Sequence, residues 1–231
     1  MQSSTSSTNR VRVNSAYSSQ ASTALPNPLL LKAIEYIRRS RFGTQFGKLT
    51  VADQGCGKLR HLRILRRHFP TIYLVDTNFQ LDRRQRLFGF DNITIREYVA
   101  RLDPRGRNLK ALSNLEFEST KLELDVVINA CVLDVELPRA RQAMFRAAHS
   151  NLKRSGLFVV IVPRNDRSIL VRCLPSNKYL DGYVFKHHGT ATFYRNFHDA
   201  RELTNGLAQH GFDLVADLSA YRQICLISSE R

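Results

Sequence analysis

The chain has 231 residues, of which 43% are hydrophobic and 24% charged, and this composition excludes a fibrous or wholly disordered protein. The length fits one domain of about 200 residues preceded by a tail. Because 35 Lys and Arg outnumber 20 Asp and Glu, the net charge is +15. We expect a basic protein that attracts anionic partners, among them nucleic acid.

The four cysteines stand far apart, at positions 56, 131, 173 and 225. They form no C-x-x-C pair and no Cys/His spacing of the zinc type, so no metal site is predicted. No apolar run approaches the roughly 20 residues that cross a bilayer, and no secretory signal opens the chain. We therefore expect a cytoplasmic protein without a membrane partner, of a subunit number that the sequence leaves open.

Residues 1–24 are rich in Ser, Thr, Asn and Gln and carry almost no large apolar side chain. Such a segment cannot offset its ordering entropy by burial, so a flexible tail is predicted. An organelle transit peptide shares this composition, although no amphipathic arginine helix is evident here. The folded domain is expected to cover residues 25–231.

An alternation of strands and helices follows the tail. Leu30, Ile34 and Ile37 repeat at helical spacing after Pro28, and residues 48–53 read as a short buried strand that runs into a glycine turn. Residues 62–69 predict a helix, and residues 72–76 a second strand. A strand, a helix and a strand within about 30 residues are typical of a crossover unit in a parallel sheet.

Further strands are predicted at Asn92 to Tyr98, at residues 124–130 and at residues 157–162. A helix precedes the last of these, beginning near Pro138 and ending at Ser155-Gly156. A helix over residues 199–210 then leads to two strands, 212–218 and 221–227, joined by a tight turn. Residues 164–191, with the pair His187-His188, show weak periodicity and predict an insertion or cap.

The glycine turn Asp53-Gln54-Gly55-Cys56-Gly57-Lys58 lets backbone N–H groups approach a ligand closely. A dinucleotide fingerprint would need a third glycine at position 60, which holds Arg60. A phosphate-binding P-loop would need glycine at position 52 and Ser or Thr at position 59, which hold Ala52 and Leu59. The spacing therefore disfavours both of these cofactor classes.

The pattern Asp53-x-Gly55-x-Gly57 at the end of a first strand resembles motif I of the class I S-adenosylmethionine-dependent methyltransferases, with Leu59 where that family usually has a third glycine. Asp76, at the end of the second strand and 19 positions after Gly57, resembles the family's ribose-binding acidic residue. The segments 125–133 and 152–158 and the pair Gly211-Phe212 resemble the family's later motifs.

This resemblance, over about residues 30–229, implies an α/β, Rossmann-like doubly wound fold with a mostly parallel seven-stranded sheet and a C-terminal antiparallel hairpin. It implies an S-adenosylmethionine-dependent methyltransferase that transfers methyl to an unidentified acceptor, anionic or nucleic acid. It implies a cofactor site made by Asp53, Gly55, Cys56, Gly57, Asp76, Thr77 and Asn129.

Methyl transfer needs chiefly an aligned nucleophile in a dry pocket, and a base where the nucleophile carries a proton. The candidates for that base and for the pocket wall are His187, His188, Asp134 and Tyr194, although His187-His188 also reads as a surface turn.

Arg60, Arg63 and Arg67 make one basic helix face, which reads either as a solvated surface or as a nucleic-acid track. The alternative function is a catalytically inactive methyltransferase-like domain that binds nucleic acid or a protein.

Overall fold

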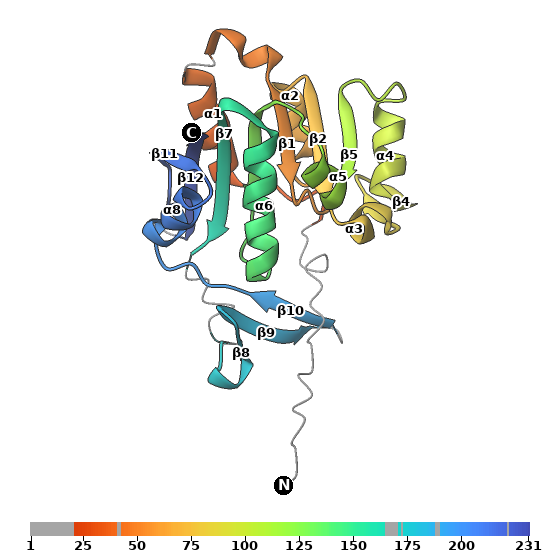
Figure 1. Ribbon diagram of the computed structural model, residues 1–231. Coiled ribbons are helices and arrows are strands. Elements are labelled where there is room, and N and C mark those ends of the chain that lie inside the picture. The colour runs from red at the N-terminus through yellow and green to blue at the C-terminus, as the bar shows by residue number, and fades with distance from the viewer. Residues whose placement is uncertain (1–20, 41–42, 165–170, 172, 188–189, 221) are drawn as a thin grey trace.

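The computed structural model describes residues 21–40, 43–164, 171, 173–187, 190–220 and 222–231. Its main sheet has seven strands in the order β11-β12-β7-β6-β1-β2-β5 (Figure 1). Their bounds are β1 Thr50–Gln54, β2 Thr71–Asp76, β5 Leu109–Ser113, β6 Leu124–Ala130, β7 Leu152–Pro163, β11 Phe212–Asp217 and β12 Gln223–Glu230. Strands β5, β2, β1, β6 and β7 are parallel, and β12 runs antiparallel to both β7 and β11. The α/β fold and the seven-stranded sheet with its antiparallel hairpin are thereby confirmed.

Helices cover both faces of this sheet. Their bounds are α1 Pro28–Arg39, α2 Leu62–His68, α3 Asn78–Asp82, α4 Ile95–Leu102, α5 Asn114–Ser119, α6 Pro138–Asn151 and α8 Ala200–Ala208, with short 3-10 helices at Gly43–Lys48 and Pro175–Asn177. The apolar sides of α1, α2 and α4 form one core with the sheet, and those of α5, α6 and α8 form the other. Figure 1 shows α5, α6 and α8 on the near face. The molecule therefore has three layers.

Strand β6 shows why the sheet lies between these layers. All seven of its residues are buried, and its apolar residues contribute to both cores. Val126 and Ile128 face the core of α1 and α2, whereas Leu124 and Val127 face the core of α5 and α6. A strand buried on both faces is typical of a parallel sheet covered by helices.

The strand order reverses between β1 and β6. From β1 the chain continues outward to β2 and β5, then returns to β6 on the other side of β1. In an open parallel sheet, ligands bind beyond the carboxyl ends of the strands at such a reversal. The loops that follow β1, β2 and β6 are therefore where a site is expected.

A second, antiparallel sheet contains β8 Lys178–Tyr179, β9 Gly182–His187 and β10 Thr190–Tyr194. In Figure 1 it lies below the main sheet, on the side to which the arrowheads of β1 and β7 point. Ion pairs connect this second sheet to the rest of the domain. Asp181, in the turn between β8 and β9, pairs with Arg141 of α6 and with Arg195. This second sheet thus stands at the carboxyl ends of the parallel strands.

The prediction of a strand at Asn92 to Tyr98 is wrong. Only Asn92 and Ile93 of that range belong to a strand, as the end of β4 Phe90–Ile93, which pairs with β3 Gln85–Leu87 in a small hairpin. Thr94 then caps α4 by a capping box with Glu97, and this local hydrogen bonding fixes a helix where apolar residues suggested a strand. The third strand of the main sheet is β5, Leu109–Ser113.

Residues 1–20 of the predicted tail lie outside the described residues. Of its last four residues, Ser22 is buried and accepts a hydrogen bond from the backbone N–H of Phe88 at 2.8 Å. None of the described helices is long and apolar enough to cross a membrane.

Candidate functional site

The glycine loop follows β1 as predicted, with φ of +82° at Gly55 and +54° at Gly57. Four of the five backbone N–H groups from Gly55 to Leu59 are used inside the protein: those of Gly55 and Cys56 donate to Val75, that of Gly57 to Asp76, and that of Leu59 to Cys56. A phosphate-binding loop instead directs such N–H groups at its ligand. These four N–H groups are therefore not directed at a phosphate.

Gly55 also lets the loop after β6 approach. A Cβ on Gly55 would lie 2.4 Å from Cγ2 of Val132 and 2.8 Å from its Cγ1, closer than real side chains come. Val132 belongs to the loop after β6, so the carboxyl ends of β1 and β6 meet at this contact. Gly55 thus allows the loops after β1 and β6 to pack together at the point where the strand order of the sheet reverses.

Asp76 ends β2 and connects it to the glycine loop. One carboxylate oxygen accepts the N–H of Gly57 at 2.8 Å, and the other accepts that of Thr77 at 2.8 Å. The side-chain amide of Gln80 also holds the glycine loop in place, because it donates to the carbonyl of Gly57 at 2.6 Å. Burial raises the pKa of Asp76, and its hydrogen bonds oppose that rise. Because a carboxylate has about four acceptor positions, Asp76 keeps capacity for further donors such as hydroxyls.

Thr77 has a structural role beside this carboxylate. Its side-chain oxygen caps α3 by accepting the N–H of Gln80 at 3.2 Å. The cap fixes the turn after β2, and so the direction of the Asp76 side chain.

Asp53, at the buried end of β1, is 1% exposed, and its Oδ2 atom has no hydrogen-bond partner among the described residues. Burial raises its pKa to about 7, with a further contribution from the charge of Asp76. Leaving a buried carboxyl oxygen unpaired is costly unless a ligand supplies a donor. Two carboxyl groups at the ends of neighbouring strands suit a ligand that carries positive charge and hydroxyl groups.

Leu59 occupies the third glycine position of motif I without filling the loop. It is 0% exposed, has φ of +64°, and belongs to the core beneath α1 and α2. The backbone thus keeps the left-handed conformation that a glycine would adopt, while the side chain packs into the protein interior. Leu59 therefore replaces glycine in the backbone geometry and adds a core contact.

Cys56 and Asn129 have buried side chains. Cys56 packs in the core beneath α1, and burial raises the pKa of its thiol well above the usual value. The amide of Asn129 lies on the α6 side of β6, donating to Gln54 at 3.2 Å, and its Oδ1 atom has no partner among the described residues. The structure thus brings Asp53, the loop glycines, Asp76 and Thr77 together, and directs the Asn129 amide elsewhere.

The acceptor-side candidates lie around the second sheet. Asp134 is buried in the loop after β6, where its carbonyl accepts the backbone N–H of Arg195 at 2.6 Å. Tyr194, at the end of β10, is also buried. His187 ends β9, but its side chain is not described, and His188 lies outside the described residues. Asp134 and Tyr194 are therefore adjacent to the junction between the two sheets.

The end of β5 was missed by sequence reasoning. Ser113 pairs with Asp76 in the sheet register, so the following turn lies beside the ribose-binding candidate. Leu115, in the first turn of α5, is largely exposed. The signal in the sequence is the capping box of Ser113 with Glu116, which marks a strand-to-helix turn of the same kind as that at Thr77.

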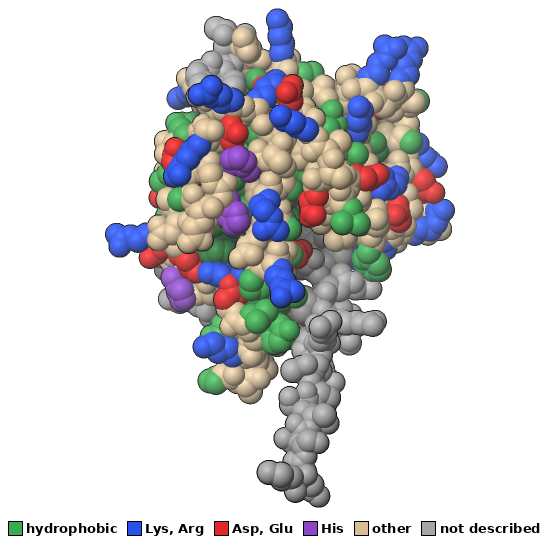
Figure 2. Space-filling view, viewed as in Figure 1, with side chains coloured by type: hydrophobic (Ala, Val, Ile, Leu, Met, Phe, Trp, Pro, Cys, Tyr) green, Lys and Arg blue, Asp and Glu red, His purple; other side chains and the backbone are tan. Residues whose placement is uncertain are grey.

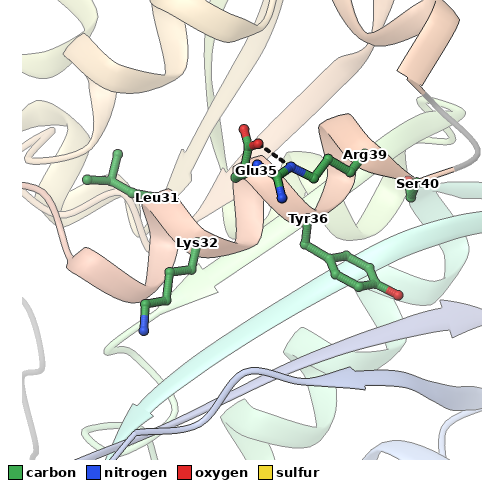
Figure 3. A pocket seen from close by; sticks show the side chains of 6 residues that line it. All are labelled: Leu31, Lys32, Glu35, Tyr36, Arg39 and Ser40. Atoms are coloured by element: carbon green, nitrogen blue, oxygen red, sulfur yellow. Dashed lines mark hydrogen bonds and ion pairs between the residues drawn. The ribbon is translucent and has the colours of Figure 1, made fainter.

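A surface hollow of about 620 Å³ lies elsewhere, along the exposed flank of α1. Leu31, Lys32 and Tyr36 line it, and Glu35 beside them is paired with Arg39 (Figure 3). No residue of the glycine loop or of the β2 and β6 ends lines this hollow. The charged and orphaned groups at the carboxyl ends, rather than this hollow, define the candidate site.

Comparison with known proteins concerns the fold. No family model and no curated protein matches the sequence. Magnesium protoporphyrin IX methyltransferase from Synechocystis PCC 6803, solved with bound SAH, is similar with a TM-score of 0.56 and 13% identity, over 88% of this chain and 82% of that one.

Two further solved structures are similar over nearly the full length. The 1,6-didemethyltoxoflavin-N1-methyltransferase of Burkholderia thailandensis, with bound S-adenosylhomocysteine, has a TM-score of 0.55 and 14% identity, over 90% of this chain and 92% of that one. A SAM-dependent methyltransferase of Methanosarcina mazei has a TM-score of 0.55 and 11% identity, over 90% of this chain and 99% of that one. These likenesses show the class I S-adenosylmethionine-dependent methyltransferase fold.

Proposed function

We propose that this chain, which has the class I S-adenosylmethionine-dependent methyltransferase fold, binds S-adenosylmethionine at the carboxyl ends of β1 and β2 and methylates an acceptor held near the second sheet. The observation that carries the proposal is the Asp76 carboxylate, anchored by the N–H groups of Gly57 and Thr77. This anchoring leaves acceptor positions open for the ribose hydroxyls of the cofactor.

The remaining groups of the site fit the same cofactor. The unpartnered Oδ2 atom of Asp53 provides an acceptor for a cationic donor, which the amino group of S-adenosylmethionine would be. The glycine loop, whose N–H groups are mostly used internally, suits a cofactor without phosphate. When bound, S-adenosylmethionine supplies a methyl group on a sulfonium, which a nucleophile displaces in one step.

The second sheet supports the acceptor side of the proposal. A displacement of this kind is favoured where water is excluded and the nucleophile is fixed. Of the predicted cap at residues 164–191, the positions 165–170, 172 and 188–189 lie outside the described residues; its strands β8 and β9 would help to exclude water. Asp134 is the candidate to take a proton from the acceptor, because it lies buried in the loop after β6 and is joined to Arg195 just after β10. Tyr194 would line the pocket.

The experiment is transfer of a radiolabelled methyl group from S-adenosylmethionine into fractionated RNA, DNA, protein and small-molecule pools. The wild type is expected to label one pool, and Asp76→Ala to abolish the label. Asp91→Asn, in the exposed ion pair with Arg86 on the β3–β4 hairpin, is the matched control and should leave labelling unchanged. Cofactor binding without labelling of any pool would instead indicate a catalytically inactive domain.

A further inference from the structure

A cluster of arginine and aromatic side chains lies on the side of the molecule formed by α2, the β3–β4 hairpin and α4. We call it the arginine–aromatic surface, and it consists of Arg63, Arg66, Phe88, Phe90, Tyr98 and Arg101. Residues 58–110, which contain it, carry thirteen Lys and Arg against five Asp and Glu. More than half of the net charge of +15 therefore comes from this segment.

The aromatic rings of this surface form one connected stack. Phe88 stacks on Tyr98 with ring centroids 5.4 Å apart and an interplanar angle of 27°, and Phe90 meets the edge of Tyr98 at 5.8 Å. Tyr98 is buried and supports the stack from below, whereas Phe90 remains 46% exposed. Folding thus leaves an aromatic ring fixed from behind and open to solvent.

Arginines flank these rings. The guanidinium of Arg63 lies 4.8 Å from the ring centroid of Phe88, and that of Arg101 lies 5.6 Å from Phe90. Burial raises the pKa of the Tyr98 hydroxyl, and the nearby charges of Arg63 and Arg66 oppose that rise. Among the described residues, neither Arg63 nor Arg66 has a carboxylate within ion-pair distance, so their charges are available to a partner.

A second pair of the same kind lies near the candidate cofactor site. Phe79 of α3 is 47% exposed, three positions after Asp76, with the guanidinium of Arg83 at 5.6 Å from its ring. On the face shown in Figure 2, Lys and Arg side chains are interspersed with Asp and Glu. Phe79 with Arg83 and Phe90 with Arg101 are thus two exposed rings accompanied by arginines.

We propose that the arginine–aromatic surface binds single-stranded nucleic acid, with a base stacked on Phe90 and with phosphates on Arg63, Arg66 and Arg101. Exposed aromatic rings take unpaired bases of any sequence, and arginines beside them neutralise the backbone. Duplex bases are already stacked on one another and gain nothing from these rings. This binding does not require S-adenosylmethionine, so its test is independent of the test of the proposed methyl transfer.

Fluorescence anisotropy of labelled single-stranded RNA and DNA of about 20 nucleotides tests the proposal, with the matching duplex and polyglutamate as competitors. The full chain is expected to bind the single strands more tightly than the duplex or polyglutamate. Phe90→Ala and Phe90→Leu should each weaken binding about tenfold, since the loss of one stacked base has that effect. A plot of log affinity against log salt concentration has a negative slope. In the double variant Arg63→Ala/Arg66→Ala, the magnitude of this slope should be smaller by about one to two.

The controls are Arg146→Ala, which removes an exposed arginine of α6, and Leu214→Ala, which removes an exposed apolar side chain of β11. Both should bind the single strands as the wild type does. A loss in Phe90→Ala that is absent in Phe90→Leu would contradict base stacking, because leucine keeps the apolar volume without the ring. Equal affinity for polyglutamate would overturn the proposal in favour of an acidic protein partner.

Discussion

Gly55 of the loop after β1 lies against Val132 of the loop after β6, so closely that a Cβ on the glycine would come within 2.4 Å of Cγ2 of the valine. We expect Gly55→Ala to lower the free energy of unfolding by about 2 to 4 kcal/mol, because it combines this overlap with an unfavourable φ of +82°. Chemical denaturation measures the loss. The same substitution should abolish cofactor binding, because it separates the ends of β1 and β6.

Gly89→Ala is the matched control for that variant. Gly89 has a similar φ of +92° but has no atom within 4 Å of the added Cβ, so its replacement should cost only about 1 kcal/mol for the backbone conformation. In the double variant Gly55→Ala/Val132→Ala, the contacts with Cγ1 and Cγ2 are removed and only that with Cβ of residue 132 at 3.1 Å remains, so a favourable coupling of about 1 kcal/mol or more is expected. Equal losses in the two glycine variants, or no coupling, would contradict the role of the Val132 contact.

Leu59 provides a test of the altered motif. Leu59→Gly restores the family pattern and relieves the left-handed conformation, but it removes a fully buried leucine from the core beneath α1. The net expectation is a loss of about 2 kcal/mol in unfolding free energy and an affinity for S-adenosylmethionine within about twofold of the wild type. A marked gain in affinity would show instead that the leucine obstructs the loop.

The carboxyl group of Asp53 makes stability depend on pH. Because burial raises its pKa to about 7, the folded protein holds this proton more tightly than the unfolded chain does. Its contribution is fully present below the unfolded pKa of about 4 and is lost as the pH rises through about 7. Asp53→Asn, which is never charged, should therefore be more stable than the wild type at pH 8, by roughly 2 to 4 kcal/mol, and similar to it at pH 4.

The comparison with Asp53→Asn isolates this group from His61. Burial lowers the pKa of His61 to about 4, so its contribution to stability is lost as the pH falls from about 6.5 through about 4, in the opposite direction. That slope is common to the wild type and the variant and cancels in their difference. If Asp53 also binds the cofactor's amino group, Asp53→Asn should bind S-adenosylmethionine about tenfold more weakly than the wild type, although the variant is the more stable protein. A pH-independent difference would refute the assigned titration.

Asp181 links the second sheet to the core, and its removal should loosen that sheet. Its carboxylate pairs with Arg141, whose side chain is 7% exposed, and with Arg195. Burial, together with the charge of Arg195, already lowers the pKa of Arg141 to about 10. We expect Asp181→Asn to cost about 1 to 3 kcal/mol, because Arg141 keeps a buried charge without its carboxylate.

Amide hydrogen exchange in β9 and β10 should rise more in Asp181→Asn than exchange in the main sheet, since the affected ion pairs hold the second sheet. The exposed pair of Arg86 with Asp91 gives the reference, and Asp91→Asn should change stability by no more than about 0.5 kcal/mol. Uniform exchange across both sheets would show that Asp181 does not attach the second sheet in particular.

The sequence could predict most of the fold because its strong signals are local. The apolar run of β6, the glycine loop after β1 and Gly211 before the last hairpin each mark an element by themselves. The strand β5 was not predicted, because Lys110 interrupts its apolar pattern. In addition, the capped helix α4 before it contains β-branched and aromatic residues that are typical of strands. The segment 164–191 offered only weak periodicity, and its strand β8 has just two residues.

For the candidate site, spacing predicted Asp53, Gly57 and Asp76, and the structure places the ends of their strands at one edge of the parallel sheet. The side chain of Leu59 could not be placed in the same way, since its direction depends on packing against α1. The turn at Ser113 was missed together with β5. Contacts between distant segments, such as that of Arg195 with Asp134, leave no pattern in the sequence.

Calorimetric titration of the wild type and Asp76→Asn with S-adenosylmethionine and with S-adenosylhomocysteine tests the central claim, that the Asp76 carboxylate holds the cofactor's ribose. The wild type is expected to bind both at micromolar concentrations, and Asp76→Asn to bind each about 10- to 100-fold more weakly, as the loss of hydrogen bonds to a charged group predicts. Asp91→Asn should bind as the wild type does. Absence of binding by the wild type, or equal affinity in Asp76→Asn, would contradict the account.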